Sequence, residues 1–247
     1  MSNTRCDTLS LSALATGRGV TVAVIDSGVY VGHPHVNGVA GGVSIGADGS
    51  VTGDFVDRIG HGTAVTAAIK EKAPDAQIYS VRVFDRSQST NVTTLIHALR
   101  WTAAAGMRIA NLSLGTSNAA HRAALAAAVL DVRRRGVIVV SARDDGGVEW
   151  LPGSLAGVIP VQVDWDCPRD TFRAVDAPTG VVFRASGLPR EIPGVPPLRN
   201  LHGVSFAVAN MSGFVARCLE HAPGASFEQV IHALSIAQTP VPAPTRH

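Results

Sequence analysis

A serine at the junction of a predicted loop and a predicted helix has the surroundings of a nucleophile. Ser205 follows Gly203, and the residues after it include apolar side chains at helical spacing. We therefore expect its hydroxyl at the positive end of a helix, beside free backbone N–H groups. A reaction that builds a negative oxygen there would be stabilised. An isolated serine in this pattern is more often a simple helix cap, so the assignment depends on partners elsewhere in the chain.

Two other residues supply the groups that a serine nucleophile needs. Residues 20–25 form a β-branched run typical of a buried parallel strand, and this run ends at Asp26, where an open α/β sheet collects its functional groups. His61 lies between Gly60 and Gly62 at a predicted helix start, a backbone freedom that a histidine of the core rarely needs. Taken alone, Asp26 would be explained equally well as the cap of a turn. Together, the carboxylate could orient the imidazole, and the imidazole could take the serine proton.

The segments around these three residues resemble motifs of the subtilase family of serine peptidases. The aspartate motif is similar to residues 22–28, the histidine motif to residues 57–63 and the serine motif to residues 203–207. The order aspartate, histidine, serine is the one already known for subtilisins. The resemblance covers about residues 18–237, nearly the whole chain.

The resemblance implies a catalytic triad with a role for each member. Ser205 would attack a peptide carbonyl, His61 would act as general base and then as general acid, and Asp26 would orient His61. The resemblance also implies a substrate-binding segment. An extended substrate would pair, as an added strand, with the backbone of Ser113, Leu114 and Gly115. The expected partner is thus a peptide or protein substrate.

The sequence departs from the family around the oxyanion hole. There the family uses the N–H group of the serine and an asparagine side chain, and here Asp145 stands at the asparagine position. The small residues that line the family's specificity pocket correspond to Ala142, Arg143 and Asp144. Arg143 would attract an acidic side chain or narrow the pocket, so we expect restricted specificity.

The replacement of the asparagine bears directly on turnover. Losing one oxyanion donor typically costs a factor of about 10² to 10³ in rate. A protonated Asp145, held neutral by burial, would donate a hydrogen bond instead. Val204 also replaces a threonine that helps to bind the oxyanion in the family. The sequence thus leaves two hypotheses, an endopeptidase of restricted specificity and a peptide-binding relative with little or no hydrolysis.

The elements that must position these residues alternate between strand and helix. Apolar runs predict strands at 20–25, 77–84, 107–112, 137–140, 158–163 and 181–185, and helical spacing predicts helices at 64–72, 91–105, 119–135, 205–221 and 226–237. Residues 32–58 and 186–204 are expected to be loops. This alternation predicts an α/β fold, a doubly wound and mainly parallel sheet with helices on both faces. We expect a single peptidase domain over residues 1–247, with a lead-in at 1–18, a frayed tail at 239–247 and no pro-domain.

Composition limits the remaining possibilities. The 247 residues are 46% hydrophobic and 16% charged, with a net charge of +2 and no basic block, which argues against nucleic acid as a partner. No secretion signal or membrane-spanning run is visible, so a cytoplasmic location and no membrane contact are expected. The three cysteines are widely spaced, which predicts neither disulfides nor a metal site. No cofactor is expected; Asp48 and Asp54 are candidates for a structural calcium site, but such loop acids are more often solvated. The oligomeric state is left open.

Overall fold

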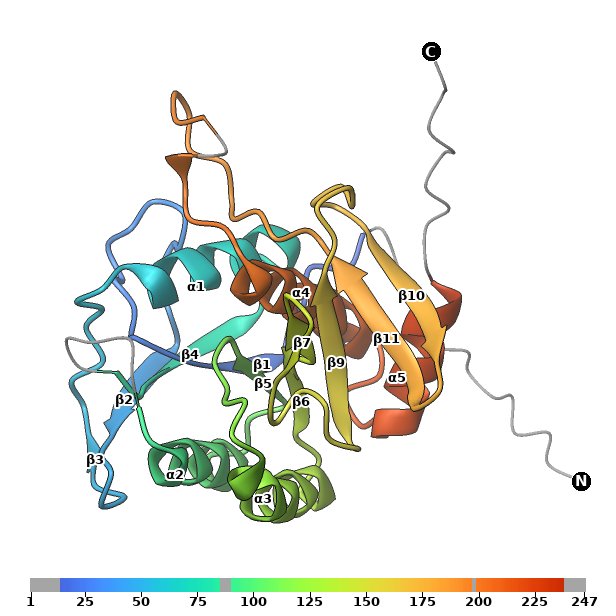
Figure 1. The fold of residues 1–247 in the computed structure, drawn as a ribbon. Coiled ribbons are helices and arrows are strands. Elements are labelled where there is room, and N and C mark those ends of the chain that lie inside the picture. The colour runs from blue at the N-terminus through green and yellow to red at the C-terminus, as the bar shows by residue number, and fades with distance from the viewer. Residues whose placement is uncertain (1–13, 85–89, 197–198, 238–247) are drawn as a thin grey trace, which may run out of the picture.

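A nine-stranded sheet forms the centre of the computed structural model, which describes residues 14–84, 90–196 and 199–237 (Figure 1). Its order is β10-β11-β9-β6-β5-β1-β4-β2-β3, and neighbouring strands from β11 to β2 are parallel. The edge strands β10 and β3 pair antiparallel with their neighbours. The strands are β1 (Thr21–Asp26), β2 (Gly41–Ile45), β3 (Val51–Thr52), β4 (Gln77–Arg82), β5 (Ile109–Leu112), β6 (Ile138–Ala142), β9 (Val158–Val163), β10 (Phe172–Ala177) and β11 (Gly180–Ala185), and a separate hairpin consists of β7 (Asp144–Asp145) and β8 (Val148–Glu149).

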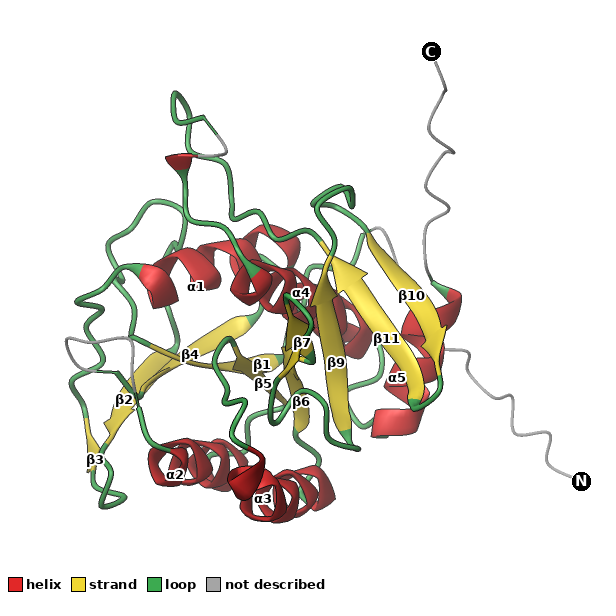
Figure 2. Cartoon of the chain, in the orientation of Figure 1, coloured by secondary structure: helices red, strands yellow, loops and turns green. Residues whose placement is uncertain are grey.

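Helices cover both faces of the sheet (Figure 2). On one face, α1 and α4 pack against each other and α5 packs against α4; on the other, α2 packs against α3. Each face therefore has its own hydrophobic core, as in a doubly wound fold. The helices are α1 (His61–Lys72), α2 (Val92–Ala104), a 3₁₀ turn (Ala119–His121), α3 (Arg122–Arg134), α4 (Val204–Glu220) and α5 (Phe227–Ile236).

Strand β1 lies in the interior of the sheet and supplies side chains to both cores. Val22 and Val24 point to the α1–α4 face, and Ala23 and Ile25 point to the α2–α3 face. All four side chains are essentially inaccessible to solvent. This double burial explains why β1 reads as a continuous apolar run and not as an alternating one.

The predicted fold class and elements are confirmed, with shifts of a few residues at their ends. Two caps behave as their sequences predict: Asn91 accepts a hydrogen bond from the Thr94 N–H group (2.8 Å), and Ser226 forms a capping box with Gln229. The prediction of a loop over residues 32–58 is wrong, because this segment contains β2 and β3.

The missed strands share a physical cause. β2 begins with Gly41 and Gly42 and is only half-buried over most of its length, and β3 has two exposed residues. β10 is an edge strand that alternates too weakly to stand out. Such strands are stabilised mainly by hydrogen bonds and packing with neighbouring strands, so their own sequences show little of the pattern that predicts a strand.

The described residues contain no helix that is both long and apolar enough to cross a membrane. Within the same residues, no group of three or more His, Cys, Asp or Glu side chains could hold a metal ion. Asp48 accepts a hydrogen bond from the Ser50 N–H group, while Asp54 forms ion pairs with Arg58 and Arg82.

Candidate functional site

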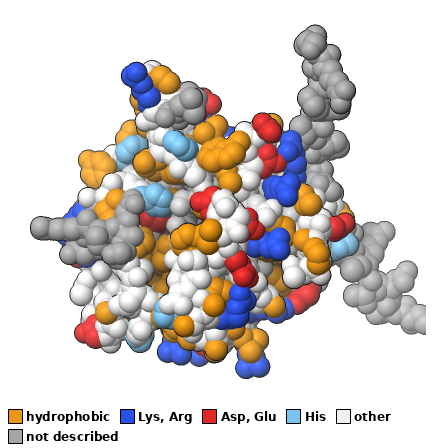
Figure 3. Space-filling model, in the orientation of Figure 1, with side chains coloured by type: hydrophobic (Ala, Val, Ile, Leu, Met, Phe, Trp, Pro, Cys, Tyr) orange, Lys and Arg blue, Asp and Glu red, His pale blue; other side chains and the backbone are white. Residues whose placement is uncertain are grey.

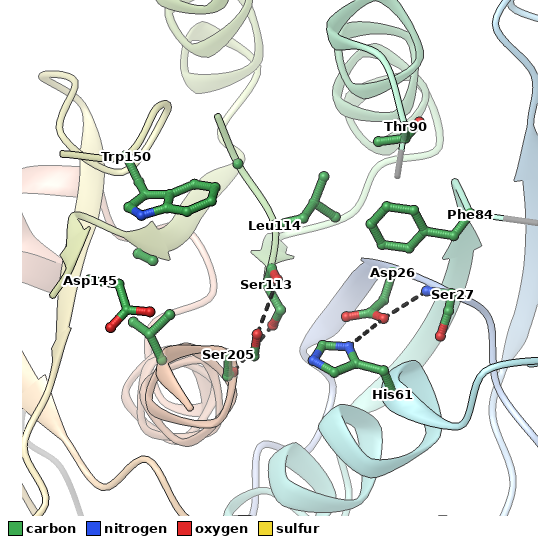
Figure 4. A pocket seen from close by; sticks show the side chains of 13 residues that line it. Asp26, Ser27, His61, Phe84, Thr90, Ser113, Leu114, Asp145, Trp150 and Ser205 are labelled. Atoms are coloured by element: carbon green, nitrogen blue, oxygen red, sulfur yellow. Dashed lines mark hydrogen bonds and ion pairs between the residues drawn. The ribbon is translucent and has the colours of Figure 1, made fainter. Parts of the chain in front are cut away.

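Three strand ends meet at one edge of the sheet. Asp26 is the last residue of β1, Ser113 directly follows β5, and Ala142 is the last residue of β6. These strands are parallel neighbours, with β5 between β1 and β6, so their carboxyl ends lie on the same edge. The helix that carries Ser205 and the helix that carries His61 begin at this edge as well (Figure 4).

Asp26 and His61 form a buried hydrogen-bonded pair. The distance from His61 Nδ1 to Asp26 Oδ1 is 2.8 Å, and the two side chains are 19% and 1% exposed. The Ser27 N–H group donates to the same carboxylate oxygen at 2.7 Å. Because an ionised carboxylate only accepts, Nδ1 of His61 carries the proton in this pair, and Nε2 is left as an acceptor.

The charge environment of His61 favours its protonated form. Burial lowers the pKa of His61, but the hydrogen bond that His61 donates to Asp26 and the charges of Asp26 and Asp57 raise it, and the net pKa lies above the usual value of 6.5. An imidazolium that forms when His61 accepts a proton is therefore stabilised in place.

Asp57 holds the loop that leads into His61. Its carboxylate accepts hydrogen bonds from the N–H groups of Ile59, Gly60 and Thr63 and from the hydroxyl groups of Ser27 and Thr63, at 2.6–2.9 Å. Burial raises the pKa of Asp57, but these donors outweigh burial and keep the pKa below its ordinary value. Asp57 thus satisfies free N–H groups at the start of α1 and ties this helix end to β1 through Ser27.

Gly62 lets the start of α1 approach the end of β1 closely. Its N–H group donates to Ser27 Oγ at 2.9 Å, and a Cβ atom at this position would lie 2.2 Å from the Gly28 carbonyl oxygen. A larger residue would push the helix away from the strand. The glycine next to His61 is therefore a packing requirement of the Asp26–His61 pair.

Ser205 is the second residue of α4, and Gly203 before it has a φ of 145°. The Ser205 hydroxyl donates to the Ser113 carbonyl oxygen at 3.2 Å. The Ser113 hydroxyl in turn donates to the Ser205 carbonyl oxygen at 3.3 Å, so the two serines bind each other. Ser205 and His61 both line the same cavity (Figure 4). Hydrogen bonds between catalytic groups are often long in ligand-free structures and shorten when substrate binds.

Two polar side chains form hydrogen bonds that hold Ser113 in place. Asn111 Nδ2 donates to Ser113 Oγ at 3.0 Å, and Ser212 Oγ donates to Asn111 Oδ1 at 2.9 Å. Asn111 and Ser212 are fully buried. The network connects β5 with α4 and fixes the Ser113 backbone beside Ser205.

The cavity at this edge has a volume of about 440 Å³. It brings together the predicted triad residues Asp26, His61 and Ser205 with most of the predicted substrate-binding and oxyanion residues, namely Ser113, Leu114, Gly115, Ala142 and Asp145. Phe84 and Trp150 add aromatic walls that sequence reasoning missed, because neither belongs to a recognisable motif. In Figure 4, Trp150 and Asp145 lie on one side of Ser113 and Leu114, and Phe84 and His61 lie on the other.

Two predicted pocket residues lie elsewhere. Among the described residues that line the cavity, Arg143 and Asp144 are absent, which differs from the expectation. Asp144 Oδ2 accepts a hydrogen bond from Gln162 Nε2 at 2.7 Å and lies 4.0 Å from Arg143 Nε. Both residues belong to the stem of the β7–β8 hairpin, so their side chains are engaged away from Ser205.

Asp145 lies next to the tip of this hairpin, and Gly146 and Gly147 form the turn with φ angles of 57° and 82°. Its side chain lines the cavity but is exposed. The burial that a protonated hydrogen-bond donor needs is therefore missing in this state of the molecule.

The sequence and the fold were compared with known proteins. The sequence profile described as "Subtilase family" matches residues 17–158. The chain is 32% identical over 238 residues to an "Alkaline protease" of Alkalihalobacillus alcalophilus, covering 91% of this chain and 60% of that protein. It is also 32% identical over 238 residues to "Subtilisin Savinase" of Lederbergia lenta, covering 91% of this chain and 85% of that protein. Thus the chain spans only about 60% of the length of the first of these relatives.

A solved structure has the same fold. It is described as a "cold adapted subtilisin-like serine proteinase", matches with a TM-score of 0.72, and covers 91% of this chain and 84% of its own. Since the two sequences are 24% identical, this likeness bears on the fold alone.

Proposed function

The chain belongs to the subtilase family, and we propose that it is a serine endopeptidase that cleaves peptide bonds through an acyl-enzyme on Ser205. The observation that carries this proposal is the 2.8 Å bond between Asp26 and His61, at the cavity that Ser205 also lines. These groups supply a nucleophile, a base and an orienting carboxylate within one solvent-accessible site.

In the proposed mechanism, substrate binding prepares the nucleophile. The Ser113 carbonyl oxygen, which now accepts the Ser205 hydroxyl, is a natural acceptor for a backbone N–H group of an extended substrate. When the substrate takes this acceptor, the hydroxyl is released to bind Nε2 of His61. His61 then removes the proton as Ser205 attacks, and returns it to the leaving amine.

The negative oxygen of the intermediate would be stabilised by the N-terminal end of α4. The Ser205 N–H group lies in the first turn of α4, where N–H groups lack partners within the helix. Asp145 stands where the second donor is expected and is exposed, so we propose that it weakens this stabilisation and lowers turnover.

The proposal of restricted substrate specificity is supported by Trp150 and Asp145, which form one wall of the cavity. A side chain that enters between Ser113 and this wall meets an aromatic ring and a carboxylate. Both favour a cationic head on an apolar stem, as in lysine and arginine. Since Arg143 does not line the cavity, we no longer expect attraction of acidic side chains at this position.

Hydrolysis of a denatured protein tests the proposal. We expect wild type to produce discrete fragments, with cleavage sites identified by mass spectrometry, and Ser205→Ala to produce none. Asn118→Ala is a matched control, because Asn118 caps the turn before α3 and does not line the cavity. If Ser205→Ala produced the same fragments in the same yield as wild type, the proposal that Ser205 is the nucleophile of a peptidase would be wrong.

The second candidate function is a peptide-binding protein with little hydrolysis. Asp145 and Val204, which both line the cavity, favour it because each replaces an oxyanion donor of the family. Asp145→Asn separates the two functions. A gain of about 10²-fold in kcat would show that the chemistry is present and limited by the carboxylate. Peptide binding without turnover in both wild type and Asp145→Asn would establish the binding function instead.

A further inference from the structure

A second pocket lies near the start of α1. It has a volume of about 430 Å³. Gly60 and Thr63, which flank His61, line it, and so does Leu201, four residues before Ser205. Its other walls are the loop around His33 and His35 and the segment around Arg190. The second pocket is therefore lined by residues close in sequence to His61 and Ser205, which line the first cavity.

The position of the second pocket indicates which part of a bound substrate it would contact. If one part of a peptide pairs with Ser113–Gly115 in the first cavity, the part beyond the scissile bond must leave past His61. His61 delivers its proton to the leaving amine, so the leaving-group segment runs toward Gly60 and Leu201. The second pocket can therefore receive a side chain from that segment. This assignment depends on the proposed endopeptidase function.

Arg190 is the fixed positive charge in this pocket. Its Nη1 donates to the His35 carbonyl oxygen at 3.2 Å, which holds the guanidinium against the pocket wall. Within the described part of the chain, no carboxylate forms an ion pair with Arg190. A guanidinium has further N–H donors in a planar fork that fits a carboxylate.

The two histidines add hydrogen-bonding ring nitrogens to the pocket. His33 Nδ1 accepts the His35 N–H group at 3.2 Å, so the ring proton lies on Nε2, which is then a donor. The two rings contact each other edge-on, with centroids 5.2 Å apart. Burial, Arg190 and His33 lower the pKa of His35, while Glu71 raises it, and the net shift keeps His35 uncharged near neutral pH.

Among the described residues that line the pocket, Asp57 is the one carboxylate, and it has partners other than Arg190. Asp57 is surrounded by the donors at the start of α1, and its oxygens accept hydrogen bonds from them. Figure 3 shows histidine side chains gathered with apolar ones on the upper part of this face of the molecule. The exposed side chains of Tyr30, Ile192 and Leu201 supply apolar contact area at the pocket.

We propose that this pocket, with Arg190 as its anchor, binds a carboxylate of the substrate on the leaving-group side of the scissile bond. The carboxylate belongs to a glutamate or aspartate side chain, or to the end of a short peptide. The two pockets would then select opposite charges on the two sides of the cleaved bond.

Paired peptides test the proposal. A peptide that wild type cleaves is synthesised with glutamate or with glutamine at each of the first three positions after the scissile bond. At one of these positions, we expect kcat/KM to be about tenfold higher for the glutamate peptide than for the glutamine peptide. This ratio corresponds to the free energy of a charge-assisted hydrogen bond at a half-exposed site. At the same position, Arg190→Gln should reduce the glutamate-to-glutamine ratio to about one, and Arg190→Lys should retain part of it.

Arg100→Gln is the matched control, because Arg100 is an exposed arginine of α2 on the opposite face of the sheet. It should keep the full ratio. Equal rates for glutamate and glutamine at all three positions, or a preference that survives Arg190→Gln, would overturn the carboxylate pocket. The wild-type ratio needs no variant and so decides the question even if Arg190→Gln fails to fold.

A binding measurement separates this proposal from the proposed function. Paired peptides that differ only by one glutamate or glutamine, whether or not wild type cleaves them, are titrated into Ser205→Ala, with and without Arg190→Gln, and Kd is measured by calorimetry. If wild type hydrolyses no peptide, the endopeptidase function fails, while tighter binding of the glutamate peptide that depends on Arg190 still supports the pocket. Equal Kd values for both peptides would refute the pocket whether or not hydrolysis occurs.

Discussion

At the scale of single residues, the site depends on the position of the proton on the His61 ring. His61 Nδ1 is bound to Asp26, and Nε2 is free to act as a base. The sequence motifs singled out these residues because their neighbours have local backbone requirements, such as Gly62 beside His61, and the catalytic roles of these residues stay a prediction. The motifs did not show that the Ser205 hydroxyl binds the Ser113 carbonyl oxygen, because this contact joins residues 92 positions apart.

In the proposed mechanism, the pKa of His61 sets the pH dependence of activity. His61 must be neutral to accept the serine proton, and its pKa is raised above 6.5 by Asp26 and Asp57 despite its burial. Activity is therefore low in acid and increases as the pH rises through this pKa. We expect the acid limb of kcat/KM to have its midpoint above 6.5. A midpoint at or below this value would mean that the paired aspartates do not govern His61.

Asp26→Asn removes the charge that orients His61. We expect kcat to fall by about 10⁴, the loss known for this change in a comparable triad, because the amide favours the wrong tautomer of the imidazole. Steady-state kinetics near neutral pH measure the effect. Asp131→Asn, on the exposed side of α3, should leave kcat unchanged, and a loss of less than tenfold in Asp26→Asn would contradict the assigned role of Asp26.

At the scale of elements, the start of α1 is the part that must be placed most accurately. It is fixed by two features: the hydrogen bonds of Asp57 and the close contact between Gly62 and Gly28. The sequence predicted the helix and its glycine-flanked start but not the role of Asp57, because the partners of Asp57 converge only when the loop folds. Likewise, β2 and β10 were missed because their stability comes from neighbouring strands.

Gly62→Ala tests the close contact. The added Cβ atom would lie 2.2 Å from the Gly28 carbonyl oxygen, so α1 must shift away from β1. We expect the free energy of unfolding to fall by about 1–3 kcal/mol, with a larger loss in kcat than in KM. Urea denaturation and kinetics give the two values. Gly53→Ala is the control, because a Cβ atom there meets nothing within 4 Å; equal behaviour of the two variants would contradict the packing argument.

At the scale of the whole molecule, an arginine joins segments that lie far apart in the sequence. Arg108 Nε donates to the Pro223 carbonyl oxygen at 2.7 Å, and its two Nη atoms donate to the carbonyl oxygens of Gly136 and Ala225. It thereby fastens the turns after α3 and α4 at the edge of the sheet opposite the active site. The alternation of strands and helices predicted this architecture, but no pattern around Arg108 indicates its partners.

Arg108→Ala should reduce stability and leave the chemistry intact. Three carbonyl oxygens lose a charged donor, so we expect a loss of about 2–3 kcal/mol in the free energy of unfolding. The value of kcat/KM, measured well below the unfolding temperature, should stay within about twofold of wild type. Arg184→Ala, an exposed strand residue, serves as the control; a similar loss of stability there would contradict the special role of Arg108.

The acylation of Ser205 tests the central claim most directly. Wild type and Ser205→Ala are treated with a fluorophosphonate, and the adduct is located by mass spectrometry of the digested protein. The account predicts one adduct, on Ser205, formed in wild type and abolished in Ser205→Ala, and slowed strongly in His61→Ala. A wild type that forms no adduct on Ser205, or forms it equally fast without His61, would contradict it.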